Sequence, residues 1–158
     1  MTGITAILQT FNDELRIGRA VESLRCCDEV LVIDHGSWDE TCKIAKHFGA
    51  KVTDATGEVT GWRRYLHHTR YEWILNVEPA ESVSESLEAS VWEWKLGKHQ
   101  ERCGFGLVTS EETPHGWVLH PAELRLVHRE RDTWQGAKPN PELSPHIFEG
   151  HLLRLRIP

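Results

Sequence analysis

Three short polar segments carry the side chains of this sequence that are best suited to chemistry, and each follows an apolar run. They are Thr10–Glu14, Asp34–Asp39 and Asn76–Glu81. Their carboxylates can accept hydrogen bonds from the base or ribose of a nucleotide, while helix N-termini and nearby cations meet its phosphates. If the three runs are strands of one parallel sheet, the segments converge beyond the carboxyl ends, where such sheets bind ligands. A nucleotide would fit such a cleft, but any doubly wound fold carries polar loops at this edge, so the spacing alone leaves both interpretations open.

The apolar spacing around these segments predicts alternating strands and helices. Strands are expected near residues 4–9, 30–33, 51–53 and 72–77, and helices near 15–26, 41–48, 62–69 and 82–99. Alternation of this kind indicates an α/β fold with a mainly parallel sheet and helices on both faces. Ser82 or Ser84 is expected to cap the last helix.

The character of the sequence changes after residue 100. Short alternating segments separated by Gly and Pro predict antiparallel or mixed strands near 105–108, 117–119, 124–128 and 152–156, and three prolines predict a loop at 138–145. We expect one domain over residues 1–158, in which the β-rich part (101–158) packs on the sheet of the first half (1–100).

Composition narrows the classes of protein to which the chain can belong. Its 24 Asp and Glu against 18 Lys and Arg give a formal charge of −6, which argues against a nucleic-acid partner because binding phosphate backbones needs a basic face. No run approaches the roughly 20 apolar residues of a membrane span, and the first residues lack the basic region of a secretory signal. We expect a cytoplasmic protein whose four cysteines, without metal-type spacing, are reduced.

Several segments, taken in order, resemble the nucleotide-binding part of family-2 glycosyltransferases, especially the bacterial lipopolysaccharide-core and β-1,4-glucosyltransferase-like branch. They are ITAILQTFNDE (4–14), DEVLVIDHGSWDET (28–41), IAKHFGAKV (44–52) and EWILNVEPAE (72–81). The second is the most specific, because strand, Asp, Gly-Ser, Asp and Thr fall in order. The later ELRLVHR (123–129), followed by WQG (134–136), is similar to the acceptor-side strand of the family.

The resemblance implies a GT-A fold whose first half, residues 1–100, binds a nucleotide sugar, and whose β-rich part faces the acceptor. The activity implied is inverting transfer of a hexose, from a UDP-sugar or similar donor, to a saccharide or lipid-linked acceptor in cell-envelope polysaccharide synthesis. A lipid-linked acceptor would be met at the inner face of the membrane. The residues that the resemblance assigns to nucleotide-sugar binding are Thr10, Asn12, Glu14, Asp34, Gly36, Ser37, Arg63 and Arg64.

Three of these assignments, those of Asp34, Arg63 and Arg64, have a plainer alternative. In the resemblance, Asp34 holds the nucleoside, but an Asp here is also a natural helix cap. Arg63 and Arg64 suit a diphosphate because guanidinium groups bind phosphate well, but two arginines are also typical of a solvated helix face.

The sequence departs from the family at the metal motif. The family ends its fourth strand with an Asp-x-Asp-type pair that holds Mg²⁺ or Mn²⁺, a task for hard oxygen ligands. Here the aligned residues are Glu78-Pro79-Ala80-Glu81, so Ala80 offers no ligand. Glu78 and Glu81 are the candidate metal ligands, and the alternative is that both are exposed acids at a helix entrance.

The sequence also departs from the family at the general base. An inverting transferase needs a group that deprotonates the acceptor hydroxyl, and the Asp of the family is replaced by His120-Pro121. Glu123 or His120 is the candidate substitute. The His-Glu pair of the family is also absent, with residues 138–140 in its place. Two rivals to an active enzyme therefore stay open: a catalytically degraded nucleotide-sugar-binding or interaction domain, and a purely structural fragment.

Overall fold

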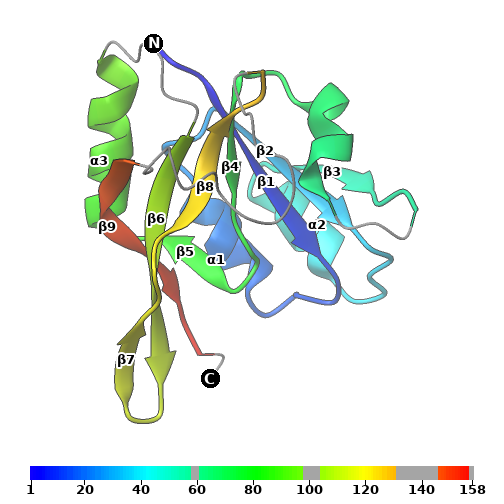
Figure 1. Cartoon of the computed structure of the whole chain (residues 1–158). Coiled ribbons are helices and arrows are strands. Elements are labelled where there is room, and N and C mark those ends of the chain that lie inside the picture. Colours follow the sequence, from blue (N-terminus) through cyan, green and yellow to red (C-terminus); the bar gives the residue numbers. More distant parts are fainter. Residues whose placement is uncertain (58–60, 98–103, 131–145, 157–158) are drawn as a thin grey trace.

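The computed structural model describes residues 1–57, 61–97, 104–130 and 146–156. Within these ranges the chain forms nine strands, three α-helices and one 3-10 helix (Figure 1). The elements are β1 (Ile4–Thr10), α1 (Ile17–Glu22), β2 (Glu29–Asp34), α2 (Thr41–His47), β3 (Lys51–Asp54), the 3-10 helix η1 (Trp62–His68), β4 (Trp73–Asn76), β5 (Glu81–Val83), α3 (Glu85–Leu96), β6 (Gly104–Thr113), β7 (Gly116–Leu119), β8 (Glu123–His128) and β9 (His146–Arg154). Three expectations lie outside the described residues: the acceptor-side similarity at 134–136, the loop at 138–145 and the replacement of the His-Glu pair at 138–140.

One sheet of nine strands runs through both halves of the chain. Its order is β3-β2-β1-β4-β8-β6-β9-β5, and β7 pairs with β6 at the side of this path. The strands β3, β2, β1 and β4 are mutually parallel, as predicted. The β-rich part then joins β4 through the antiparallel strand β8, so that it packs on the same sheet, also as predicted.

The pairing register brings the carboxyl ends of three strands to one edge. Thr10, at the end of β1, is paired with Asp34, at the end of β2. On the other side of β1, Ile7 is paired with Asn76, the last residue of β4. The polar segments after β1, β2 and β4 therefore meet at one edge of the sheet, which confirms the arrangement predicted from the apolar runs.

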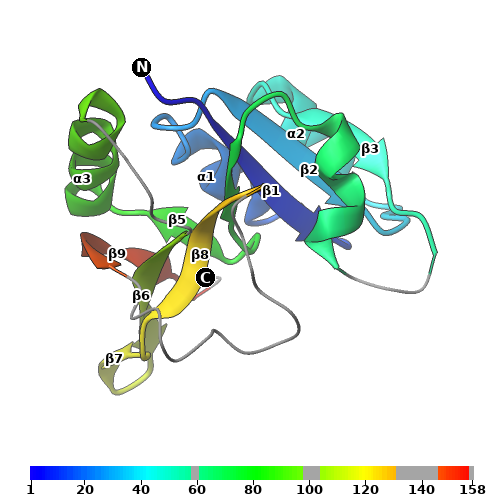
Figure 2. The same cartoon turned by 45° about the horizontal axis from the view of Figure 1, so that its top comes forward.

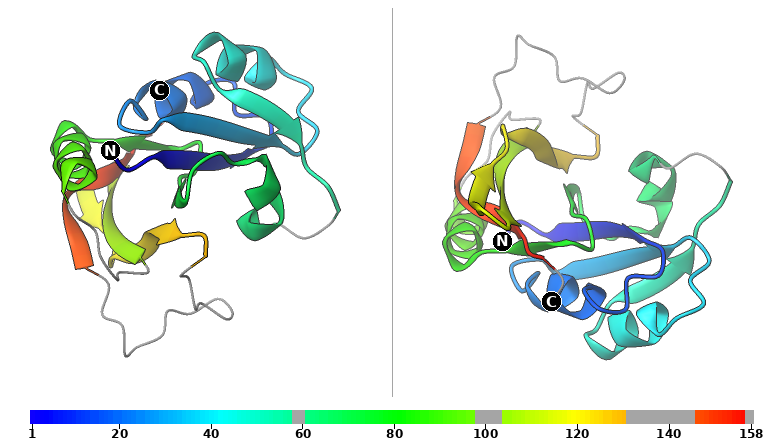
Figure 3. Two further views of the ribbon diagram at one scale, coloured as in Figure 1. Left: turned by 90° about the horizontal axis from the view of Figure 1, so that it is seen from above. Right: turned by 90° about the horizontal axis from the view of Figure 1, so that it is seen from below.

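Alternating side chains of β1 supply two hydrophobic cores, because successive residues of a strand point to opposite faces. Ile4, Ala6 and Leu8 belong to a core that includes residues of α1 and α3. Ile7, on the other face, packs with Tyr65 of η1. Figure 3 shows α1 and α2 on one face of the parallel strands and η1 on the opposite face. Helical elements cover both faces, as predicted.

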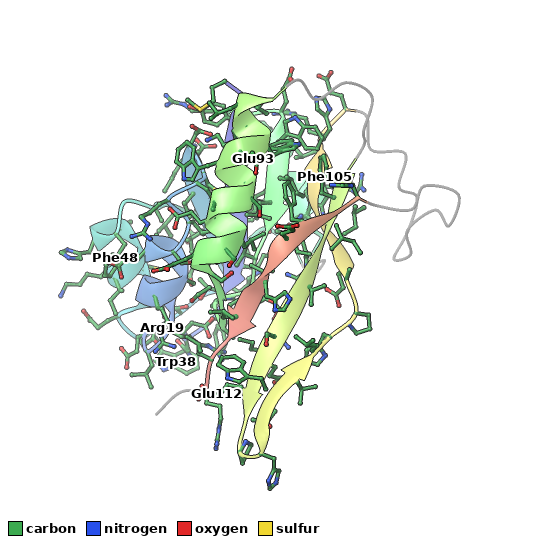
Figure 4. The ribbon with its side chains drawn as sticks, turned by 90° about the vertical axis from the view of Figure 1, so that its left-hand side faces the viewer. Arg19, Trp38, Phe48, Glu93, Phe105 and Glu112 are labelled. Carbon is green, nitrogen blue, oxygen red and sulfur yellow. The ribbon has the colours of Figure 1, made fainter. Side chains whose placement is uncertain are left out.

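An aromatic cluster fastens α3 to the strands of the second half. The ring centroids of Trp94 and Trp73 lie 4.9 Å apart, and those of Phe105 and Phe148 also lie 4.9 Å apart. In Figure 4, Phe105 and Glu112 mark the two ends of β6, and Trp38 lies at the same end of the molecule as Glu112. The β6–β7 hairpin therefore projects from the end where β1 and β2 terminate (Figure 1).

Two helices differ from their predicted form. The helix expected near 62–69 is the 3-10 helix η1. The helix expected near 82–99 starts later than predicted, because its first residues belong to strand β5, which pairs with β9. Helix α3 starts afterwards, capped by Ser84, whose hydroxyl accepts a hydrogen bond from the Leu87 N–H at 3.2 Å. Across the described ranges, none of the helices has both the length and the apolar character needed to cross a bilayer.

Candidate functional site

A cleft of about 720 Å³ opens at the carboxyl ends of β1 and β4. The elements that line it, β1, β4, η1 and β8, lie around this part of the sheet in Figure 2. The described lining residues are Ile7, Gln9, Thr10, Phe11, Arg16, His35, Trp62, Arg63, Asn76, Val77, Glu78, Pro79, Ala80, Leu124 and Arg125. The cleft therefore lies where open α/β sheets bind their ligands.

The lining is basic although the chain is acidic. Arg16, Arg63 and Arg125 reach the cleft from three different elements or loops, and Glu78 is the one Asp or Glu among the described lining residues. The Arg63 guanidinium lies 4.9 Å from the Trp62 ring centroid, which holds it by a cation–π contact. Three guanidinium groups in one cleft favour an anionic ligand with several oxygens, such as a diphosphate.

The loops after β1 and β2 are tied to each other rather than open to the cleft. Asn12, with a left-handed backbone (φ 51°), donates its N–H to Ser37 Oγ at 2.9 Å, and its side-chain oxygen accepts from the Trp38 N–H at 3.0 Å. Glu14 accepts from the Glu40 N–H at 3.1 Å. Of the predicted residues in these loops, Thr10 lines the cleft, while Asn12, Glu14 and Ser37 hold the loops together at its edge.

Asp34 lies buried at the end of β2 and organises the loop that follows. Its carboxylate accepts hydrogen bonds from Ser37 Oγ at 2.5 Å and from the Ser37 N–H at 3.2 Å. Burial acts to raise the pKa of Asp34, but the hydrogen bonds from Ser37 and from neighbouring groups outweigh it and lower the pKa below its ordinary value. Gly36 has φ +89°, a conformation that favours glycine, so the turn depends on this residue.

The two arginines of η1 are in different positions. Arg63 lines the cleft. The guanidinium of Arg64 instead lies beside Gly57, so close that a Cβ added at position 57 would be 3.0 Å from its Nη1. Arg64 does not belong to the described lining. The sequence could not tell which of these neighbours faces the cleft, because that depends on how η1 packs against the sheet.

The turn after β4 encloses an ion-pair cluster. Glu81 is fully buried, and its carboxylate binds Arg125 through two hydrogen bonds of 2.9 and 3.0 Å. Arg154 lies 3.3 Å from the same carboxylate and 2.7 Å from that of Glu78. Burial acts to lower the pKa of Arg125, but the bonds and charge of Glu81 raise it above its usual value.

Glu78 and Glu81 do not fit a divalent cation in this arrangement. The Glu81 oxygens accept from Arg125, Arg154, Thr109 and the Glu78 N–H, which takes up the roughly four lone-pair positions of a carboxylate. Ala80 offers no ligand, and Glu78 is paired with Arg154. Among the described residues, no three His, Cys, Asp or Glu side chains gather where they could hold a metal ion. The expectation of exposed acids holds for Glu78 only, since Glu81 is buried.

The two candidate bases lie in different places. Glu123 begins β8 beside Leu124 and Arg125, which line the cleft, and its largely exposed carboxylate accepts from Arg125 Nε at 3.1 Å. His120 lies after β7, with Nε2 2.6 Å from a carboxylate oxygen of Glu111 on β6, outside the described lining. Of the two, Glu123 is therefore the better placed for a ligand in the cleft.

Sequence reasoning did not single out four polar side chains of the cleft, Gln9, Arg16, His35 and Arg125. Arg16 binds the buried Asp13 carboxylate through Nε at 2.8 Å, and His35 Nε2 lies 2.8 Å from the side-chain oxygen of Gln9. Arg125 lies between Leu124 and Leu126 in the strand predicted near 124–128. An arginine within an apolar run is a signal that could have identified it, because such a charge is rarely buried without a partner.

Comparison with known proteins finds relatives that are named as glycosyltransferases. No protein-family model matches the chain. An uncharacterised glycosyltransferase of Rickettsia typhi is 33% identical over 109 residues, which make up 64% of this chain and 35% of that protein. The lipopolysaccharide core biosynthesis glycosyltransferase LpsC of Rhizobium meliloti is 23% identical over 164 residues, 93% of this chain and 56% of that protein. The chain thus spans between about a third and about half of these relatives.

A solved structure with a similar fold is glucosyl-3-phosphoglycerate synthase from Mycobacterium tuberculosis, in complex with Mn²⁺, uridine diphosphate and glucosyl-3-phosphoglycerate. It matches with a TM-score of 0.51 and 20% identity over 70% of this chain and 43% of that one. The α/β fold described above, with a parallel first half and a mixed second half, is the GT-A fold, as the resemblance implied.

Proposed function

Because the chain belongs to the family-2 glycosyltransferases, we propose that it forms the donor-binding part of an enzyme that transfers a hexose from a nucleotide sugar to a saccharide or lipid-linked acceptor, with inversion. The observation that carries the proposal is the arginine-lined cleft at the carboxyl ends of β1 and β4. A nucleotide sugar has the chemistry that this cleft would recognise, an anionic diphosphate between two uncharged polar groups.

Roles for individual residues follow from their positions. Arg16 and Arg63 would contact the diphosphate, and Trp62 and Phe11 offer flat apolar surfaces to the base or sugar. Thr10 and His35, which line the cleft, would lie against the nucleoside, on loops that Asp34, Asn12, Glu14, Gly36 and Ser37 hold together. The hydrogen bonds between the segments after β1 and β2 hold these loops rigid, and a preorganised site loses less free energy to ordering on binding.

In the proposed reaction, an acceptor hydroxyl oxygen attacks the anomeric carbon of the hexose as the bond from that carbon to the diphosphate oxygen breaks. The nucleoside diphosphate leaves with the bonding electrons, and the hydroxyl proton passes to a base. Glu123 is the proposed base and His120 the second choice, because Glu123 adjoins the cleft. The proposed enzyme would work in the cytoplasm, at the inner face of the membrane if its acceptor is lipid-linked.

The relatives support the transferase over the degraded binder. The Rickettsia typhi and Rhizobium meliloti relatives are named as glycosyltransferases, and LpsC is named for lipopolysaccharide core biosynthesis, which supports an envelope saccharide as the acceptor.

Turnover tests the proposal. We would incubate the protein with UDP-hexoses and GDP-hexoses and measure the release of free nucleoside diphosphate, with water or added saccharides as acceptor. Glu123→Gln should reduce the rate about 100-fold or more, the contribution typical of a general base. His120→Gln should have a smaller effect. Nucleotide binding with no release from any donor would favour the binder, and no nucleotide binding at all would refute both.

A further inference from the structure

The place that the family gives to a divalent cation is taken up here by an ion-pair cluster of two carboxylates and two guanidinium groups, Glu78, Glu81, Arg125 and Arg154. Three features carry the inference: the state of the carboxylates, the position of Arg125, and the charge of the cleft. It rests on the proposed function, since it concerns how the same cleft holds the donor.

The carboxylates of the cluster are already neutralised. Glu81 has no exposure to solvent, and the guanidinium groups of Arg125 and Arg154 both bind its oxygens. A divalent cation that took these oxygens as ligands would have to displace Arg125 from a bidentate pair and would then lie close to two positive charges. Both requirements oppose binding of the cation, since buried charges are stable only with their partners.

Arg125 binds the ion-pair cluster and also lines the cleft. Its guanidinium donates to the Glu81 carboxylate, Nη1 also donates to the Asn76 carbonyl oxygen at 3.2 Å, and Nε donates to Glu123. These contacts hold Arg125 in the wall of the cleft, next to the end of β4. Its four hydrogen bonds to described residues leave one of the five N–H groups of a guanidinium for a ligand.

The other two arginines of the lining complete a cationic surface. Arg16 is anchored on Asp13 by a 2.7 Å ion pair, with its side chain 39% exposed, and Arg63 is stacked on Trp62. A guanidinium group binds phosphate oxygens in the same planar geometry that it uses for carboxylates, and its charge does not depend on pH in the physiological range. Asp13 and Glu81 balance the charges of Arg16 and Arg125, so the three groups replace a metal mainly as guanidinium donors to the phosphate oxygens.

We propose that this cleft binds the diphosphate of its donor through Arg16, Arg63 and Arg125 without a divalent cation. The proposal departs from the metal dependence that the resemblance implied. It predicts that the affinity for a nucleoside diphosphate is no weaker without metal than with it, and that it falls with salt, because exposed guanidinium–phosphate attraction is screened.

Calorimetric titration of the whole chain with UDP and with GDP, in EDTA and in Mn²⁺, provides the test. The expected result, for whichever nucleotide binds, is a Kd in EDTA that is no weaker than the Kd in Mn²⁺. In parallel, the electron paramagnetic resonance signal of free Mn²⁺ should be no lower with protein and nucleotide together than with nucleotide alone. Binding that needs Mn²⁺, or loss of the free Mn²⁺ signal on adding protein, would overturn the inference and leave the proposed function standing.

Variants show which arginines act. Arg63→Met, on the exposed face of η1, should weaken binding in EDTA by about 10- to 100-fold, the value of one charge-assisted hydrogen bond. Arg19→Met removes the same charge from an exposed position of α1, outside the described lining, and should leave the Kd unchanged. Equal effects of the two variants would overturn the inference. No binding of UDP or GDP by the folded wild type, with or without metal, would instead refute the proposed function.

Discussion

Substitution of Glu81 by glutamine should destabilise the protein strongly, because it removes the charge that balances Arg125 inside the fold. Glu81 is fully buried, the Arg125 side chain is only 10% exposed, and the two are joined by paired hydrogen bonds. Breaking a buried ion pair from one side typically costs about 3–5 kcal/mol of unfolding free energy. Arg154 is 30% exposed and can turn to solvent, so we expect the lower figure, about 3 kcal/mol.

The chain supplies a matched control for this substitution. Glu123 pairs with the same guanidinium at 3.1 Å, but its side chain is 66% exposed. An exposed pair contributes about 0–1 kcal/mol, so Glu123→Gln should change stability little. Both variants keep the size of the side chain and remove one negative charge next to Arg125, so that they differ mainly in burial.

Urea unfolding followed by tryptophan fluorescence measures both effects. With a denaturant slope of about 2 kcal/mol/M, a loss of about 3 kcal/mol lowers the midpoint for Glu81→Gln by about 1.5 M. Glu123→Gln should shift it by less than about 0.5 M. Equal shifts for the two variants would refute the conclusion that burial makes the Glu81–Arg125 pair a structural element of the cleft wall.

Three further predictions concern the loops at the cleft. Burial and the neighbouring Asp34 carboxylate raise the pKa of Cys42 to about 11, so only about one thiol in a thousand is ionised at pH 8. Labelling with a thiol reagent followed by mass spectrometry should find Cys42 slow to react, and faster in Asp34→Asn. Because the pKa of Asp34 is lowered on folding, its contribution to stability is present above the ordinary aspartate pKa of about 3.9 and is lost as the pH falls through the pKa of the folded state. Asp34→Asn should therefore flatten the acid-unfolding curve below about pH 4, and an unchanged curve would contradict the lowered pKa. Gly36→Ala should cost about 1–2 kcal/mol through its left-handed backbone alone, whereas Gly61→Ala, in equally open space with φ −68°, should cost far less by the same unfolding measurement.

Much of the fold could be predicted from local patterns. The apolar runs of β1, β2 and β4 are buried on both faces of the sheet, so they are nearly continuous in the sequence and easy to recognise. The register that brings Thr10 beside Asp34 follows from parallel pairing of such runs. The position of the cleft followed in turn, because it depends on topology more than on any single side chain.

The details of the site could not be predicted, because they depend on contacts between residues distant in sequence. From the sequence, Glu81 is expected to be an exposed acid or a metal ligand. In the structure, its carboxylate binds Arg125, 44 positions away. Asn12 and Ser37, 25 positions apart, were expected to face the ligand, but they bind each other. Polar side chains with several possible partners are assigned by tertiary structure, which local spacing does not encode.

The most direct test of nucleotide binding at the described cleft is a titration of the isotope-labelled protein with UDP and GDP, followed through its backbone amide NMR signals. We predict that the largest shifts fall on Gln9–Phe11, His35, Asn76–Glu78 and Ala80, with the Trp62 side-chain N–H among them. Another cleft, lined in part by Glu22, Arg25 and Arg70, lies at the opposite ends of the strands. Shifts concentrated there, or no shifts with either nucleotide, would contradict this assignment.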